Sequence, residues 1–204
     1  HGAYGGEGND IINVSLDNQN GTFSNIPRIY GGNGNDDINI SAVTSSNLTV
    51  TIHGGEGDDD IYLGNVTEGI STLNGDTGND LIEIDTVDSG SDTVKAYGGD
   101  DNDIIVVDQI LSGKLDLDGQ AGNDTISLVG GAGVDVIFGG GGNDTAGFSF
   151  NRSDYDISFS GTSIIVNDNL STDGIDSLTS IENLQFSDMT LIVILGNSTA
   201  ETID

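Results

Sequence analysis

The sequence predicts an all-β fold, a parallel β-solenoid, and three observations carry this prediction. A nine-residue pattern rich in glycine recurs along the chain at steps that give a coil of roughly 20 residues. Apolar residues recur at two fixed places relative to that pattern. Apolar and polar residues also alternate, as in Leu48, Val50 and Ile52, which is the period of a half-buried strand. Coils this short cannot enclose a core alone, so each coil depends on its neighbours.

The recurring pattern is G-G-x-G-x-D-x-U-x, where U is apolar. Successive copies start 26, 23, 21, 23, 21, 11 and 9 residues apart, and the last two steps add to 20. This arithmetic places seven motifs in one row along one edge and the motif at Gly130 half a coil away, on the opposite edge. The eight copies start at Gly5, Gly31, Gly54, Gly75, Gly98, Gly119, Gly130 and Gly139.

Two apolar ladders follow from the same frame and predict a long, thin core with two short strands per coil. The polar segments 18–25, 44–47 and 87–92 suit ordinary turns on the far edge. One ladder is the U position, Ile12, Ile38, Ile61, Ile82, Ile105, Ile126, Ile137 and Ala146. The other stands two residues before each motif, Ala3, Ile29, Ile52, Leu73, Ala96, Leu117, Leu128 and Ile137.

Composition limits what can hold such a fold together. The chain has 204 residues with 34 acidic and 4 basic side chains, a net charge of −30 and no cysteine. Disulfides and thiolate metal sites are therefore excluded, and a cation is the remaining staple. The negative charge disfavours nucleic acid as a partner. The longest apolar stretch, Leu191 to Leu195, is too short to span a membrane.

The turn pattern points to calcium. Glycine at positions one, two and four allows backbone angles closed to other residues, so carbonyl oxygens can point alternately up and down the stack. Aspartate at position six adds a carboxylate. Calcium takes six to eight oxygens at about 2.3 to 2.6 Å, which two neighbouring turns can supply. Each ion is therefore predicted to bridge two coils.

The eight copies in phase resemble the repeats-in-toxin (RTX) family of hemolysin-type calcium-binding nonapeptide-repeat proteins, which form a parallel β-roll with calcium in its turns. The resemblance implies that carbonyls of positions two and four of one turn meet those of positions one and three of the next, with both aspartates. The candidate metal residues are Gly5, Gly6, Glu7, Gly8, Asp10, Gly31, Gly32, Asn33, Gly34, Asp36, Gly54, Gly55, Glu56, Gly57, Asp59, Gly75, Asp76, Thr77, Gly78, Asp80, Gly98, Gly99, Asp100, Asp101, Asp103, Gly119, Gln120, Ala121, Gly122, Asp124, Asp135, Gly139, Gly140, Gly141, Gly142 and Asp144.

Seven stacked turns leave six gaps, so we expect up to six calcium ions in one main row. Their charge of +12 offsets part of the −30, and the metal-free chain is expected to be expanded and to fold on metal addition. Asp76, Asp101 and Gln120 stand where the pattern has glycine. We expect weaker sites at these three positions.

The repeat frame stops near Phe148, which predicts three units: a calcium-binding roll over 1–147, a C-terminal β cap over 148–195, and the start of a further repeat over 196–204. The stretch from Asn151 to Asp188 resembles the segment that follows such repeats in exported bacterial proteins. Its aromatic residues suit a cap on the open end of a solenoid. A chain that begins and ends in repeat sequence suggests a piece of a longer protein.

These observations predict a non-catalytic, calcium-binding structural module of a larger secreted bacterial protein, for instance an adhesin or a surface-layer protein. The resemblance implies folding on calcium after type I secretion, at an extracellular or cell-surface location. The partners expected are calcium, the rest of the parent polypeptide and a cell-surface or glycan contact.

No catalytic residue is predicted. His1 and His53 have no second histidine nearby, Asp58 to Asp60 fall inside the calcium frame, and the serines lack a basic partner. Two alternatives stay open, a repeat module attached to a secreted enzyme or toxin, and a polysaccharide- or ice-binding solenoid. For an ice-binding face, only Thr49 and Thr51 form the expected threonine pair.

Overall fold

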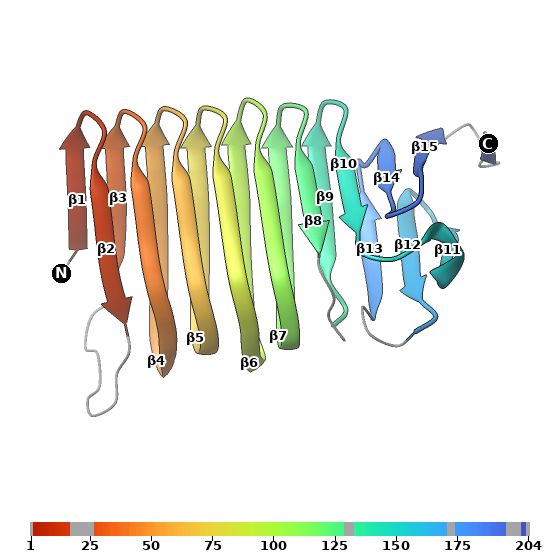
Figure 1. Cartoon of the computed structure of the whole chain (residues 1–204), viewed down its shortest axis with the longest axis horizontal. Helices are drawn as coiled ribbons and strands as arrows, with labels where there is room; N and C mark the ends of the chain where they lie inside the picture. Colours follow the sequence, from red (N-terminus) through yellow and green to blue (C-terminus); the bar gives the residue numbers. More distant parts are fainter. Residues whose placement is uncertain (1, 17–26, 129–132, 171–173, 195–200, 203–204) are drawn as a thin grey trace.

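The computed structural model describes residues 2–16, 27–128, 133–170, 174–194 and 201–202, and these residues form a parallel β-solenoid followed by a β cap (Figure 1). Within this part of the chain, no helix is long and apolar enough to cross a membrane. The roll contains β1 (Gly2–Glu7), β2 (Ile11–Leu16), β3 (Arg28–Asn33), β4 (Asp37–Glu56), β5 (Asp60–Thr77), β6 (Leu81–Asp100), β7 (Ile104–Ala121), β8 (Thr125–Leu128), β9 (Val136–Gly141) and β10 (Thr145–Phe148).

Seven tight turns follow one another along one edge of the roll, at the top of Figure 1. We call this the main edge; its turns join β1 to β2, β3 to β4, β4 to β5, β5 to β6, β6 to β7, β7 to β8 and β9 to β10. These are the turns of the motifs at Gly5, Gly31, Gly54, Gly75, Gly98, Gly119 and Gly139. The single main row predicted from the spacing is therefore confirmed.

The motif at Gly130 lies on the opposite edge, between β8 and β9. The strand after it, β9, pairs in parallel with the second half of β7 through Leu117 and Ile137, whereas β8 pairs with the first half of β7 through Ile105 and Ile126. The half-coil offset predicted from the steps of 11 and 9 residues is thus confirmed. Residues 130–132 of this motif lie outside the described residues.

The opposite edge differs from the prediction of ordinary turns. Segments 44–47 and 87–92 lie inside β4 and β6, which have 20 residues each and run continuously around this edge. Parallel pairing reaches the bend from both sides and is interrupted within it, between Thr44 and Thr49 in β4 and between Asp88 and Thr93 in β6, where register shifts absorb the differences in coil length. Backbone pairing with the neighbouring coil thus extends into these segments only as far as Thr44 and Asp88. The predicted turn at 18–25 lies outside the described residues.

Both predicted ladders form the core. The U residues pair in order from Ile12 to Ala146, and from Ile38 onward each is at most 1% exposed. The second ladder pairs in order from Ala3 to Ile137. The placement of Leu128 in this ladder was wrong, because Leu128 pairs with Val107 and Phe148 on the other side of the roll. Ile137 belongs to the second ladder alone, since Ile126 pairs directly with Ala146 in the first. Ala3 and Ile12 are only partly buried because they belong to the first coil.

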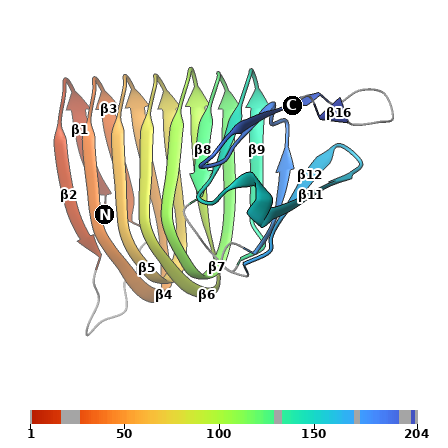
Figure 2. The same ribbon diagram turned by 45° about the vertical axis from the view of Figure 1, so that its right-hand side comes forward.

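The cap follows β10 and consists of the 3₁₀ helix η1 (Arg152–Asp154), β11 (Tyr155–Ser160), β12 (Ser163–Asp168), β13 (Ile175–Thr179), β14 (Asn183–Gln185), β15 (Thr190–Ile194) and β16 (Glu201–Thr202). Two of its strands continue the roll in parallel register: Leu178 of β13 pairs with Ile137, and Leu184 of β14 pairs with Ala146. The hairpin of β11 and β12 projects beside this last coil (Figure 2).

Antiparallel strands and aromatic rings close this end. Strand β15 pairs antiparallel with β14, so the next strand after β14 does not extend the parallel stack. Phe148, Tyr155 and Phe186 form a cluster with ring centroids 5.3 to 5.4 Å apart, and the Arg152 guanidinium lies 5.8 Å from the Phe186 ring. Of the segment 196–204, only Glu201 and Thr202 are described, and they pair with β15.

Candidate metal centre

The position-six aspartates of the main edge form a continuous hydrogen-bonded ladder. In each turn the aspartate backbone N–H donates to Oδ1 of the aspartate one coil later. Each acceptor is therefore fixed by the turn before it, which orients its carboxylate. The bonds are Asp10 to Asp36 (2.7 Å), Asp36 to Asp59 (2.7 Å), Asp59 to Asp80 (2.8 Å), Asp80 to Asp103 (2.8 Å), Asp103 to Asp124 (2.8 Å) and Asp124 to Asp144 (2.9 Å).

The second oxygen of every one of these carboxylates is buried without a hydrogen-bond partner among the described residues. This holds for Oδ2 of Asp10, Asp36, Asp59, Asp80, Asp103, Asp124 and Asp144. The side chains from Asp36 onward are at most 2% exposed. Because an unpaired buried carboxylate is costly, these seven oxygens call for a cation.

The unpaired Oδ2 atoms face carbonyl oxygens of the next turn. A Cβ added to the first glycine of each of the first six motifs would lie within 2.7 Å of two atoms: Oδ2 of the same motif and the carbonyl oxygen of the first residue of the next motif. The two oxygens therefore border one space between adjacent turns. Any side chain at position one would fill that space, which explains the glycine found there in every copy.

The other carbonyls point along the stack in the directions that the family resemblance implies. Position-two and position-four carbonyls point toward the next turn, as Gly6 O toward Gly32 and Gly34 O toward Gly57. Position-three carbonyls point back: the Gly8 N–H donates to Asn33 O at 2.6 Å. Each gap is thus lined by backbone oxygens and carboxylate, the hard donors that calcium prefers.

Most of the oxygens that line a gap are backbone carbonyls, so a gap contains few metal-binding side chains. Among the described residues, no group of three or more His, Cys, Asp or Glu side chains converges in a way that could hold a metal. The donor chemistry of a gap excludes metals that require nitrogen or sulfur ligands and suits a large oxygen-binding cation.

Burial raises the pKa of five of the ladder carboxylates. It raises the pKa of Asp59 and Asp103 to about 7 and that of Asp80 to about 6, against the lowering effect of the donated backbone hydrogen bonds. The pKa of Asp124 and of Asp144 is raised by the same cause. These turns therefore hold negative charge poorly without a cation.

A second ladder, which the sequence analysis did not single out, runs along position five. The backbone N–H of each position-five residue donates to Oδ1 of the position-five residue in the preceding turn. This direction is opposite to that of the aspartate ladder. The signal was present in the sequence, because position five is Asn or Asp in every copy except Val134. The bonds join Asn35 to Asn9, Asp58 to Asn35, Asn79 to Asp58, Asn102 to Asn79, Asn123 to Asn102 and Asn143 to Asn123, at 2.8 to 3.2 Å.

The three non-glycine residues at glycine positions adopt left-handed backbone angles. Asp76 and Gln120 at position two have φ of 79° and 74°, and Asp101 at position four has φ of 80°. The φ values of Asp76 and Gln120 are smaller than the 105° to 130° of the position-two glycines, and that of Asp101 is smaller than the 95° to 157° of the position-four glycines, so the turn adapts to the side chain. Asp76 and Gln120 stay in register with the position-two glycines of the neighbouring turns. A non-glycine residue in this region costs about 1 to 3 kcal/mol.

Replacing Gln120 with glycine is therefore expected to stabilise the calcium-bound roll by about 1 kcal/mol, since the relief of backbone strain exceeds the added chain entropy of glycine. Thermal unfolding in millimolar calcium measures the change. The matched opposite is Gly99→Ala at position two of the preceding turn, where φ is +130° and a Cβ would clash with the Asp76 carbonyl oxygen. A Gln120→Gly variant no more stable than the parent would contradict the strain argument.

On the opposite edge, the surroundings of Asp135 are similar to those of the aspartates in the main-edge ladder. Its Oδ1 accepts the Leu115 N–H at 2.9 Å, its Oδ2 is buried without a hydrogen-bond partner in the described part, and burial raises its pKa to about 6. Its own N–H donates to Asp176 Oδ1 of the cap at 3.3 Å. Gly174, Asp176 and Leu178 repeat the G-x-D-x-U spacing, a signal that the sequence analysis missed.

Of the two histidines and the run of acids at 58–60, the structure describes His53 and the three aspartates. His53 stacks on Tyr30 with ring centroids 4.9 Å apart, and its Nδ1 lies 2.9 Å from Asp76 Oδ2. Asp58 and Asp60 are exposed on the flank of their turn. His1 lies outside the described residues.

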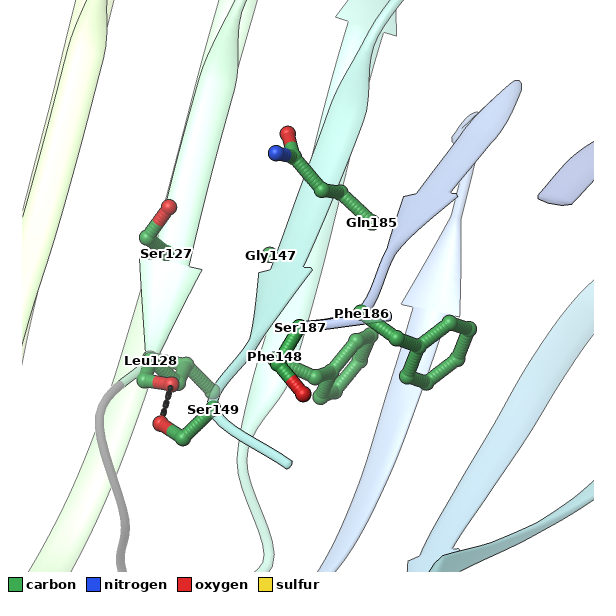
Figure 3. A pocket seen from close by; sticks show the side chains of 8 residues that line it. All are labelled: Ser127, Leu128, Gly147, Phe148, Ser149, Gln185, Phe186 and Ser187. Atoms are coloured by element: carbon green, nitrogen blue, oxygen red, sulfur yellow. Dashed lines mark hydrogen bonds between the residues drawn. The ribbon is translucent and has the colours of Figure 1, made fainter. Parts of the chain in front are cut away.

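A shallow pocket of about 320 Å³ lies where the roll meets the cap, beside β8, β10 and β14 (Figure 3). Its lining contains no ionisable side chain, and Ser149 in it donates a hydrogen bond to the Leu128 carbonyl at 3.2 Å. The pocket is lined by Ser127, Leu128, Gly147, Phe148, Ser149, Gln185, Phe186 and Ser187.

Comparison with known proteins agrees with the geometry of the turns. A family model described as the RTX calcium-binding nonapeptide repeat (4 copies) matches residues 3–18, 28–39, 50–67, 65–83 and 116–146. No curated protein matches the chain. The matched ranges leave out the motif at Gly98, which carries Asp101 at position four, yet its turn keeps the register of the row. The matched ranges thus carry RTX calcium-binding nonapeptide repeats, and the described residues between 3 and 146 fold as the parallel β-roll that such repeats form.

Proposed function

We propose that this chain is a non-catalytic structural module of a larger secreted bacterial protein, which folds when its main edge takes up as many as six calcium ions. The observation that carries the proposal is the row of buried Oδ2 atoms, each facing a carbonyl oxygen of the next turn. RTX repeats occur in secreted proteins, which supports an extracellular or cell-surface location. The parent protein could be an adhesin or a surface-layer protein.

Charge spacing explains why the metal governs folding. Neighbouring strands lie about 4.8 Å apart, so the roll stacks like-charged carboxylates at that spacing along the whole edge. The chain has only four basic side chains to offset a net charge of −30. Calcium ions between the carboxylates replace this repulsion with attraction, and their binding free energy becomes folding free energy.

Each proposed ion lies between two turns. For the first gap the proposed oxygens are the carbonyls of Gly6, Gly8, Gly31 and Asn33, together with the carboxylates of Asp10 and Asp36. This set has the number and kind of ligands that calcium takes. The gaps next to Asp76, Asp101 and Gln120 hold their ions less tightly, because those turns carry backbone strain.

The proposed division of the chain is a calcium-binding roll over 1–147, a cap over 148–195 and the start of a further repeat over 196–204. The solenoid would then continue into the rest of the parent polypeptide, its first partner. A cell surface or a glycan is the second proposed partner.

The dependence of folding on free calcium tests the proposal. At the submicromolar calcium of a bacterial cytosol the chain should stay unfolded and suited to type I secretion, and at millimolar calcium it should fold, because extracellular modules bind calcium with Kd of about 10⁻⁴ to 10⁻³ M. Far-UV circular dichroism in calcium buffers gives the midpoint. Full β structure below 1 µM free calcium would overturn the proposed link between calcium and export.

A further inference from the structure

The last nonapeptide turn of the main edge is covered by a turn of the cap. Strands β13 and β14 continue the two sides of the roll, with Leu178 paired to Ile137 and Leu184 paired to Ala146. The turn that joins them, Ser180 to Glu182, therefore stacks on the turn of the Gly139 motif (Figure 1). It lacks the nonapeptide pattern, so nothing in its local sequence marks it as a metal site.

Glu182 takes the place of the next position-six aspartate. The Asp144 N–H donates to Glu182 Oε2 at 2.8 Å, within the 2.7 to 2.9 Å range of the six bonds of the aspartate ladder. Asn183 pairs with Thr145, so it stands at the place of position seven, and its side-chain amide donates to Asn143 Oδ1, the last acceptor of the position-five ladder, at 3.3 Å. The aspartate ladder therefore crosses from the roll into the cap, and a side-chain bond ends the position-five ladder there.

Ser180 supplies the carbonyl that belongs at position one. A Cβ added to Gly139 would meet both the Ser180 carbonyl oxygen and Asp144 Oδ2, the same pair of groups that surrounds the first glycine of each earlier motif. Asp144 is 1% exposed, and its Oδ2 has no hydrogen-bond partner in the described part of the chain. Ser180 has φ of 54°, a left-handed conformation held in spite of its side chain.

The side-chain length at position 182 fits the shape of this turn. Between the paired residues Phe138 and Thr145 the roll has six residues, whereas between Thr179 and Asn183 the cap has three. A shorter turn leaves its carboxylate farther from the gap. The additional methylene of glutamate restores the reach that an aspartate has in the longer turns.

We propose that the gap between the Gly139 motif and the Ser180–Glu182 turn is a seventh calcium site of the main row, and that this ion fastens the cap to the roll. The inference rests on the proposed calcium row. Its protein ligands are Asp144, the Ser180 carbonyl and Glu182, joined by forward carbonyls of the last nonapeptide turn. The short cap turn offers fewer carbonyls, so water completes the coordination and this site binds more weakly than the inner ones.

Glu182→Gln tests the site with little change in shape, because the amide oxygen can still accept the Asp144 N–H. At saturating calcium, equilibrium dialysis followed by elemental analysis should give one ion fewer than in the parent chain. Hydrogen exchange should become faster at the β14 amides and stay unchanged in β4 to β6. The control is Asp156→Asn, which removes one exposed carboxylate from β11 and should leave the ion count and the exchange unchanged.

Glu182→Asp keeps the negative charge but shortens the side chain by one methylene, so this variant should also lose the ion. The site would be refuted by a Glu182→Gln variant that keeps the parent's ion count and cap protection while circular dichroism shows an intact roll. Failure of the proposed function looks different: in that case the parent chain itself binds no calcium at the main edge. An intact parent row with one ion missing in both Glu182 variants supports the seventh site.

Discussion

Removal of calcium is expected to abolish the β structure of residues 2–148 and expand the chain. The reason is the imbalance between acidic and basic side chains, since 34 acids face 4 bases and the ladder carboxylates are buried next to one another. A core of stacked isoleucine, leucine and valine is only as wide as one coil, so it cannot offset that repulsion and the chain entropy together. Each coil lost also exposes its neighbour, which makes the loss cooperative along the roll.

Small-angle scattering and far-UV circular dichroism in chelator measure this expansion. An unfolded chain of this length has a radius of gyration of about 50 Å, well above that of the folded roll. Magnesium is the matched control: it demands a small octahedral site and keeps its waters, so it should not restore the fold at the concentration at which calcium does. A β spectrum that persists in chelator would contradict the metal dependence of the fold.

Local patterns sufficed to predict the roll, because nearly every coil contains the turn motif and the apolar positions that define it. The eight aspartates and the two apolar ladders recur at fixed offsets, so the spacing of the motifs alone predicts that Gly130 lies on the opposite edge. The same arithmetic did not predict that segments 44–47 and 87–92 lie inside long strands that run around the bend. Pairing there depends on the neighbouring coil, and polar residues alone do not reveal it.

The cap shows where prediction from the sequence ended. Its aromatic residues indicated a cover for the open end, and Phe148, Tyr155 and Phe186 do form its cluster. Glu182 could not be found by motif, since its role follows from stacking on Asp144, 38 residues earlier. Only the register of Leu184 on Ala146 brings the two together. The hairpin of β11 and β12 separates Glu182 from Asp144 in the sequence, so no short motif contains both residues.

Neutralising one ladder carboxylate in the middle of the row should cost far more than neutralising its neighbour in sequence. Asp59 is fully buried, accepts the Asp36 N–H through Oδ1 and directs an unpaired Oδ2 into a proposed ion gap. Asp60, the next residue, is exposed. Asp59→Asn keeps an oxygen acceptor for the Asp36 N–H but places an N–H donor among oxygens, where a cation is proposed to bind.

Because each aspartate is proposed to serve the gaps on both of its sides, Asp59→Asn should remove two ions. An ion present at about 10 times its Kd contributes about 1.4 kcal/mol, so the loss of two lowers the free energy of unfolding by about 3 kcal/mol. Asp60→Asn removes the same charge from the surface and should change it by no more than about 0.5 kcal/mol. Urea unfolding in millimolar calcium, with ion counts on both variants, separates the two cases. If the two variants unfold alike and keep equal ion counts, the buried ladder does not hold the metal, and the charge of the chain as a whole accounts for its calcium dependence.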